Sequence, residues 1–231
     1  MINIIKNRNK KKNITTFLNP FSYVLAKNNK AQLSHFNIEI DGGLLVKLLN
    51  LFGISCKRKS FDMTSLAPIV FNAAIEENKT IYFIGTKLKL IDLAINNIQQ
   101  KFPELNICGF RDGYLSQEER DNVFADINNL EADYVICGMG TPLQEQFLLD
   151  LKETGWKGSG YTCGGFLHQT ANGIKYYPHW INQLGLRAFY RMYDEPTLIK
   201  RYFIDYPKAI VIIIYDILVY KFTNKVKESF F

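Results

Sequence analysis

The chain of 231 residues is long enough to bury one sizeable core, and its 47% hydrophobic and 22% charged residues exclude a chain that is disordered throughout. The net charge of +6 suits an anionic ligand or an anionic membrane surface, and equally suits solubility alone. Four scattered cysteines without a CxxC pair indicate buried free thiols in a reducing compartment. The three histidines show no metal-ligand spacing, so we expect no metal site.

The first third of the chain predicts a lead and two short strand–helix units. Residues 1–13 are basic and are expected to form a flexible lead. Apolar spacing and the turn residues that follow it define the elements beyond this lead. In chain order we expect a strand over 14–18, a helix from Asn19-Pro20 to about 27, a strand over 37–40, a helix over 44–51, and an apolar helix ending near 77.

From residue 80 onward, strands and helices alternate. This alternation predicts a parallel sheet flanked by helices, with right-handed crossovers, and therefore a Rossmann-like α/β domain over 14–177. The expected strands are 80–84, 106–110, 132–137 and 159–163, and the expected helices are 88–101, 117–130 and 142–154.

The pattern changes at Pro178 to aromatic and basic helices without strands, which predicts a helical appendage over 178–231. Its longest apolar stretch, 209–219, is interrupted by Asp216 and is shorter than the ~20 residues that span a bilayer. This stretch is therefore either a core helix or a helix that lies on a membrane. Aromatic side chains mixed with arginines suit a lipid–water interface and a diphosphate. The basic residues form no dense run, so nucleic acid is not an expected partner.

The most informative run begins at Gly138, directly after the apolar strand 132–137. Gly138 and Gly140 allow a tight turn and a close backbone approach to a ligand. Pro142 is expected to open the next helix, with Gln144 and Glu145 in its first turn beside the free N–H groups. A strand, a glycine turn and a polar helix start form a ligand site in many α/β proteins, although an ordinary strand-to-helix turn has the same pattern.

Asp41 is the first candidate for chemistry. It ends a predicted strand, precedes Gly42 and Gly43, and faces an open loop, where a carboxylate can act as a general base. The alternative is that Asp41 only starts a turn or caps the next helix. Asp62 precedes a helix and is interpreted as an N-cap that can still lie at the same edge of the sheet.

Three further strand ends carry weaker signals. Gly85 begins what resembles a phosphate loop, but the other glycines of a dinucleotide fingerprint are absent. Tyr114 can place its ring over a sugar or base, or can simply close a turn. After the last strand, a second glycine pair precedes polar side chains that can bind hydroxyl or phosphate groups, and this set consists of Gly164, Gly165, His168 and Gln169.

Taken together, these runs resemble the WecG/TagA/CpsF family of bacterial glycosyltransferases from Asn19 to about Phe203. The individual motifs are short, but their order and spacing are specific. The resemblance lies in Asn19-Pro20, Asp41-Gly42-Gly43, Ser60-Phe61-Asp62, Ile84-Gly85, Pro103, Gly113-Tyr114, Gly138 to Glu145, Gly164-Gly165-Phe166, Pro178-His179-Trp180-Ile181, Leu184-Gly185-Leu186-Arg187, Tyr190-Arg191 and Glu195-Pro196.

The resemblance implies metal-independent, inverting transfer of an N-acetylhexosamine-type sugar from a UDP-sugar to a polyprenyl-diphosphate-linked acceptor, without a cofactor. It implies that Asp41 is the base and that Asn19 contacts the sugar or the acceptor. The appendage would bring arginines over the site while the protein lies on the cytoplasmic face of the cell membrane. The implied nucleotide contacts are Gly138, Gly140, Pro142, Gln144 and Glu145, and the implied arginines are Arg187, Arg191 and Arg201.

Two departures from the family pattern bear on the substrate. Phe17 stands where the family usually has a threonine, and His168 stands where it usually has an aspartate. The missing acidic contact, which His168 or Gln169 would replace, leaves a UDP-hexose donor as an alternative to a UDP-N-acetylhexosamine. A catalytically silent nucleotide-sugar-binding scaffold and an NAD-dependent enzyme are further alternatives. Asp41 argues against the scaffold, and the incomplete glycine pattern after Ile84 argues against the NAD-dependent enzyme. The sequence is compatible with a homo-oligomer as well as with a monomer.

Overall fold

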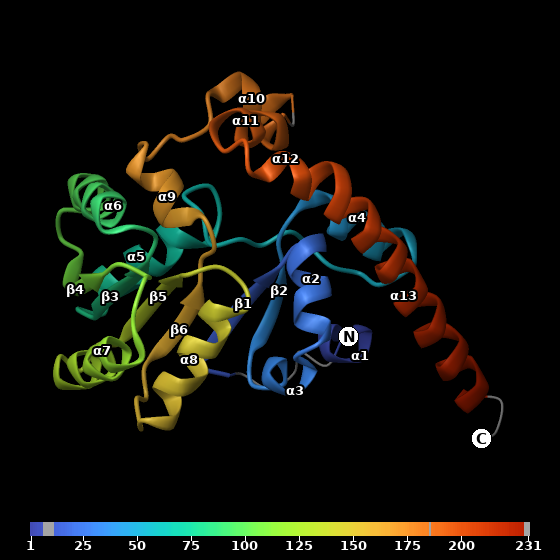
Figure 1. Cartoon of the computed structure of the whole chain (residues 1–231), viewed down its shortest axis with the longest axis horizontal. Coiled ribbons are helices and arrows are strands. Elements are labelled where there is room, and N and C mark those ends of the chain that lie inside the picture. The colour runs from blue at the N-terminus through green and yellow to red at the C-terminus, as the bar shows by residue number, and fades with distance from the viewer. Residues whose placement is uncertain (7–11, 185, 229–231) are drawn as a thin grey trace.

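The fold is built on a six-stranded sheet in a computed structural model that describes residues 1–6, 12–184 and 186–228. Every paired strand is parallel to its neighbour, and the strand order is β2-β1-β6-β5-β3-β4 (Figure 1). This confirms the predicted parallel α/β sheet, with strand ends that differ from the expected ones by no more than two residues. The strands are β1 (Ile14–Leu18), β2 (Asn37–Ile40), β3 (Thr80–Gly85), β4 (Asn106–Arg111), β5 (Tyr134–Gly138) and β6 (Ser159–Thr162).

Helices cover both faces of the sheet, so its central strands are buried on both sides. Along β3, Ile81 and Phe83 join one hydrophobic cluster, whereas Tyr82 and Ile84 join the other, because successive side chains of a strand point to opposite faces. One face packs against α5 (Leu66–Glu76), α6 (Leu88–Lys101) and α9 (Phe166–Ala171), and the other against α1 (Ile2–Lys6), α2 (Pro20–Lys27), α3 (Lys30–Leu33), α4 (Gly43–Leu51), α7 (Gln117–Asn129), α8 (Leu143–Glu153) and α13 (Tyr206–Glu228).

The start of the chain differs from the flexible lead that we expected over 1–13. Ile2–Lys6 form the short helix α1, which buries Ile2 and Ile5 against α13 and β2. The two isoleucines lie three positions apart and therefore share one face of the helix. Residues 7–11 lie outside the described residues, whereas Lys12 donates from Nζ to the Phe36 carbonyl at 2.8 Å.

The described residues beyond Pro178 form helices and no strand, as the sequence predicts. The long helix α13 is not detached from the sheet domain, because Ala209, Ile213 and Ile217 are buried where it crosses α2 (Figure 1). Asp216 also faces inward and accepts hydrogen bonds from Tyr23 and Lys27. The other elements of this segment are α10 (His179–Gln183), α11 (Arg187–Asp194), α12 (Leu198–Lys200) and the π-helical turn η1 (Arg201–Asp205).

Within the described part of the chain, no helix combines the length and the apolar character that a membrane crossing requires. This agrees with the expectation for the stretch 209–219. The inner side of α13 is buried in the core. The interpretation of this stretch as a core helix therefore holds for that side.

A close backbone contact between β3 and β5 fixes the centre of the sheet edge. Gly85 has φ +144°, and a Cβ there would lie 2.5 Å from the Gly138 carbonyl oxygen.

We expect Gly85→Ala to lower the free energy of unfolding by about 3 kcal/mol or more, through overpacking and backbone strain together. Gly53→Ala is the matched control, because Gly53 also has a positive φ but has open space around it, and should cost about 1–2 kcal/mol. Equal losses in denaturant unfolding would contradict this account.

Candidate active site

A cavity of about 960 Å³ lies over the carboxyl ends of five of the six strands. For each of these strands, the lining includes either its last residue or the residue that follows it. These residues are Asn19, Asp41, Thr86, Gly138 and Thr162. Such an edge is where ligands bind in open parallel sheets. The segment after Pro178 supplies the opposite wall of this cavity, and its lining residues are Arg187, Ala188, Arg191, Glu195, Leu198, Arg201, Tyr202 and Tyr206.

Asp41 stands directly after β2, as the sequence predicts, and its backbone N–H donates to the Leu18 carbonyl at 2.8 Å. Its Oδ1 accepts from the Gly42 N–H at 2.7 Å and lies 3.3 Å from Nη2 of Arg58. The side chain keeps 34% of its surface exposed, but this surface faces the cavity. Burial raises the pKa of Asp41 above its ordinary value, and the Arg58 charge only partly opposes the rise. Asp41 is therefore a stronger base than a surface carboxylate.

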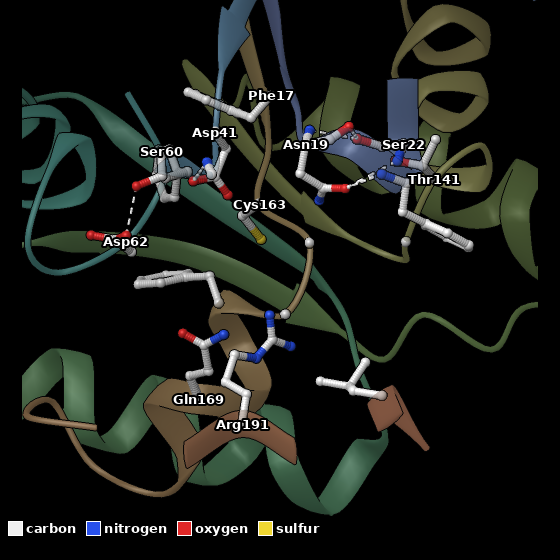
Figure 2. Close-up of a pocket in the computed structure, with 18 of the residues that line it drawn as sticks. Phe17, Asn19, Ser22, Asp41, Ser60, Asp62, Thr141, Cys163, Gln169 and Arg191 are labelled. Carbon is white, nitrogen blue, oxygen red and sulfur yellow. Dashed lines mark hydrogen bonds between the residues drawn. The ribbon is translucent and has the colours of Figure 1, made fainter. Parts of the chain in front are cut away.

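Asp62 is held on the other side of the same guanidinium. Its Oδ2 accepts from Ser60 Oγ at 2.6 Å (Figure 2). The same oxygen accepts from Arg58 at 2.8 Å, and Oδ1 accepts from Thr64. Burial acts to raise the pKa of Asp62, but these hydrogen bonds together lower it. The N-cap of α5 is Ser65, so Asp62 is not the N-cap that we expected. It closes a turn ahead of the helix and lines the cavity.

The glycines of the site fall into two groups. Gly85 and Gly138 are required by packing, since a Cβ on Gly138 would lie 2.9 Å from Cys163 Sγ and 3.0 Å from the Gly164 carbonyl oxygen. Gly140 and Gly164 instead have φ +80° and +53° with nothing within 4 Å of an added Cβ. This second pair lines open space where a ligand can approach the backbone, and so does Gly43 at the start of α4.

The run after β5 lies partly below the cavity. Helix α8 begins at Leu143, and Pro142 occupies its N-cap position rather than its first turn. Gln144 reaches the cavity lining and accepts the Gly164 N–H at 3.1 Å. Glu145 is 4% exposed and does not line the cavity. Two of the expected nucleotide contacts, Pro142 and Glu145, therefore border only a separate small pocket next to α2 and α3.

Cationic side chains from the C-terminal helices reach the cavity. The Arg201 guanidinium lies 4.1 Å from the centre of the Phe21 ring, and its Nη2 is 3.5 Å from Asn19 Oδ1. Arg191 pairs with Glu195 at 3.0 Å, and Arg187 lies over the Tyr177 ring. The described lining carries five cations against three carboxylates, which suits an anionic ligand. The cations are Lys47, Arg58, Arg187, Arg191 and Arg201, and the carboxylates are Asp41, Asp62 and Glu195.

Asn19 and Gln169 approach the cavity from different sides (Figure 2). Asn19 caps α2, because its Oδ1 accepts from the N–H groups of Phe21 and Ser22 at 3.0 Å each. The carbonyl oxygen of this amide is thereby occupied. Gln169 and His168 both line the cavity from α9, as expected from the second glycine pair.

Tertiary structure also brings together a set of potential metal ligands that linear spacing did not indicate. Atoms of His168, Asp194 and Glu195 lie within 4.8 Å of one another. Both carboxylates already have partners, since Asp194 accepts from Tyr176 Oη at 2.5 Å and Glu195 pairs with Arg191. A neighbouring guanidinium disfavours a second cation here.

The site residues predicted from the sequence and the residues that line the cavity differ at several positions. Tyr114 is 70% exposed and does not line the cavity, and Gly85 lies outside the lining as well. Arg58 was missed, although its spacing of four from Asp62 was the one available signal. Ser60 stood in a motif of the family resemblance but was not predicted as a site residue. The aromatic part of the lining, which the predicted site residues also omit, consists of Tyr177, Tyr202 and Tyr206.

A parallel α/β domain with a cavity at its carboxyl edge, lined by more cations than carboxylates and by the buried carboxylate Asp41, suits an enzyme that acts on anionic substrates. The family model described as "Glycosyl transferase WecG/TagA/CpsF family" matches residues 1–223. The chain therefore belongs to this glycosyltransferase family, which confirms the resemblance found in the sequence.

Two named glycosyltransferases are among the proteins that are similar to the chain. A Shigella boydii protein named UDP-Gal:alpha-D-GlcNAc-diphosphoundecaprenol beta-1,4-galactosyltransferase is 41% identical over 214 residues, which cover 91% of this chain and 90% of that protein. The N-acetylglucosaminyldiphosphoundecaprenol N-acetyl-beta-D-mannosaminyltransferase of Bacillus subtilis (strain 168) is 28% identical over 132 residues. That match covers 57% of this chain and 51% of the Bacillus protein.

The position of Arg58 makes the titration of Asp41 testable. We expect carbon-detected NMR to give Asp41 a pKa above the ordinary value of 3.8, because burial outweighs the guanidinium. Arg58→Gln should raise this pKa further, since removal of the cation disfavours the ionised form. Lys59→Gln is the control, because Lys59 pairs with Glu39 instead. A pKa of Asp41 that falls in Arg58→Gln would refute the electrostatic account.

Proposed function

We propose that the protein transfers galactose from UDP-galactose to an N-acetylglucosaminyl-diphosphoundecaprenol acceptor, with inversion at the anomeric carbon. The observation that carries this proposal is the 41% identity to a named galactosyltransferase over nine tenths of both chains. Both characterised relatives have the same acceptor in their names, whereas their donors differ. This supports the UDP-hexose alternative over the N-acetylhexosamine donor that the sequence first suggested.

Asp41 is the proposed base. It takes the proton from the attacking acceptor hydroxyl while that oxygen forms a bond to the anomeric carbon and the bond to the UDP oxygen breaks. UDP-galactose carries an α-linked sugar, so one displacement gives the β product. The raised pKa of Asp41 suits proton abstraction, and the Arg58 charge, which opposes part of that rise, favours the ionised form of the carboxylate.

The leaving UDP carries developing negative charge, which the cationic wall is suited to stabilise. Arg187, Arg191 and Arg201 line the cavity from the C-terminal helices, while Gly140 and Gly164 leave backbone open on its floor. Fixed cations and backbone dipoles stabilise such charge without a metal ion. Each of these arginines therefore belongs to the proposed site for a diphosphate.

The donor sugar is proposed to lie near α9. His168 lines the cavity where the family resemblance implies an acidic contact. A neutral imidazole offers one donor and one acceptor in place of a carboxylate, so the hydrogen bonds to the sugar change. This departure supports a donor other than the N-acetylmannosamine type.

We also propose that the outer side of the C-terminal segment lies on the inner face of the cell membrane, which brings the cavity to its lipid-linked acceptor. While the inner side of α13 is buried on α2, its other side exposes apolar side chains at helical spacing. These exposed side chains are Val211, Tyr215, Leu218 and Phe222, and Phe203 of η1 adds to them.

The test of the proposed reaction is product formation from a short-chain N-acetylglucosaminyl-diphosphate lipid with UDP-galactose or with UDP-N-acetylhexosamines. We expect turnover with UDP-galactose, and Asp41→Asn should lower it by roughly 10²–10⁴-fold while calorimetry still detects UDP binding. Asp121→Asn, exposed on α7, is the matched control.

Preference for an N-acetylhexosamine donor would refute the galactose assignment, and unchanged turnover in Asp41→Asn would refute the base. UDP binding without any turnover would favour the silent scaffold. Chelator should leave activity intact, and a strict need for a divalent ion would point instead to His168, Asp194 and Glu195.

The membrane proposal is tested by co-sedimentation with vesicles that contain anionic lipid. We expect the double variant Val211→Glu/Tyr215→Glu to lose vesicle binding, because two charges then replace exposed apolar contacts. Turnover of a short-chain soluble acceptor should be retained. Leu93→Glu is the control, since Leu93 is an exposed leucine on α6. Undiminished binding would assign the membrane contact to another surface, such as the basic N-terminus.

A further inference from the structure

Glu145 is a buried carboxylate below the floor of the cavity. Its Oε1 accepts hydrogen bonds from Thr16 Oγ1 at 2.7 Å, Thr141 Oγ1 at 3.2 Å and Gln144 Nε2 at 3.2 Å. Its Oε2 is also buried and has no hydrogen-bond partner among the described residues. A carboxylate in such surroundings costs stability unless its contacts have another use.

The hydrogen bonds of Glu145 and its partners connect β1, β6 and the turns that follow β5 and β6. Thr16 belongs to β1, and its hydroxyl accepts from Thr162 of β6 at 3.1 Å. Thr141 lies in the turn after β5. Gln144 extends the network, because its Oε1 accepts the Gly164 N–H in the turn after β6. One carboxylate oxygen therefore holds β1 to the two glycine turns.

These two turns form the part of the floor where a ligand can approach the backbone. Gly140 lies in the first turn and Gly164 in the second, and both leave the space beside their Cα atoms open. The direction of their peptide groups depends on how the turns are held. Hydrogen bonds fixed before the ligand arrives reduce the free energy lost on binding.

We propose that Glu145 is a positioning residue for the donor diphosphate, acting through Thr141 and Gln144 without touching the donor. This inference rests on the proposed function, because it takes a UDP-sugar as the ligand. Direct contact is disfavoured for two reasons: Glu145 is absent from the cavity lining, and a carboxylate beside a diphosphate would repel it. Its Oε1 instead accepts hydrogen bonds from two threonine hydroxyls and an amide, and of these partners Thr141 and Gln144 line the cavity.

The test uses Thr16, which is fully buried and does not line the cavity. Thr16→Val removes the shortest hydrogen bond to Glu145 with little change of shape, and we expect UDP to bind about 10-fold more weakly or worse in calorimetry. Thr16→Ser keeps the hydroxyl and should restore wild-type affinity. Circular dichroism of each variant at the assay temperature identifies the folded samples.

A second set of variants keeps the inference falsifiable if one of these fails to fold. Glu145→Ala should weaken UDP binding by about 10–100-fold, whereas Glu145→Gln, which retains an acceptor at Oε1, should keep most of the affinity. The double variant Thr16→Val/Glu145→Ala should bind no more weakly than Glu145→Ala alone, because both changes break one network.

The outcomes separate this inference from the proposed function. If wild-type protein fails to bind UDP, the proposed function fails, and the inference fails with it. If the wild type binds UDP and folded Thr16→Val binds equally well while Glu145→Ala does not, Glu145 contacts the donor directly and the inference is overturned. Strictly additive losses in the double variant would also overturn it.

Discussion

The close contact between the ends of β3, β5 and β6 is the constraint on which the site depends. Gly85 packs against the Gly138 carbonyl, and Gly138 packs against Cys163 and Gly164, with no room for side chains between them. This contact places three turns side by side at one edge of a parallel sheet. The cavity exists because these turns form its floor while the helices after Pro178 form its wall.

Charge is distributed unequally around this cavity. On the side of β2, Arg58 is shared between Asp41 and Asp62, and it limits the rise in the pKa of Asp41. On the opposite side, Arg187, Arg191 and Arg201 lie along the C-terminal wall. Even so, these cations are within electrostatic reach of the carboxylate that we propose as the base, because Arg191 also lowers the pKa of Asp41 and Arg187 donates to Thr64 Oγ1 beside Asp62 at 3.4 Å.

The sequence predicts a single helical appendage after Pro178, but the inner and outer sides of its helices differ in what they contact. Their inner side belongs to the sheet domain, because α13 is buried on α2 and Arg201 stacks on Phe21. Their outer side exposes the apolar residues for which we propose a membrane contact. The cationic wall is carried by α11 and η1, which precede α13 in the chain, so the proposed membrane contact would lie next to the cavity.

The sequence by itself determined the order of strands and helices, the parallel sheet and the family. Periodicity and turn residues act locally, so they could be read without knowledge of the fold, and the position of Asp41 at the end of a strand followed from them. Only the tertiary structure decided that Arg58 joins Asp41 to Asp62, that Tyr114 stays outside the cavity, that Ile2 and Ile5 are buried, and that Glu145 lies below the floor. These results depend on contacts between segments far apart in the chain, and side-chain burial at such contacts leaves no periodic signal in the sequence.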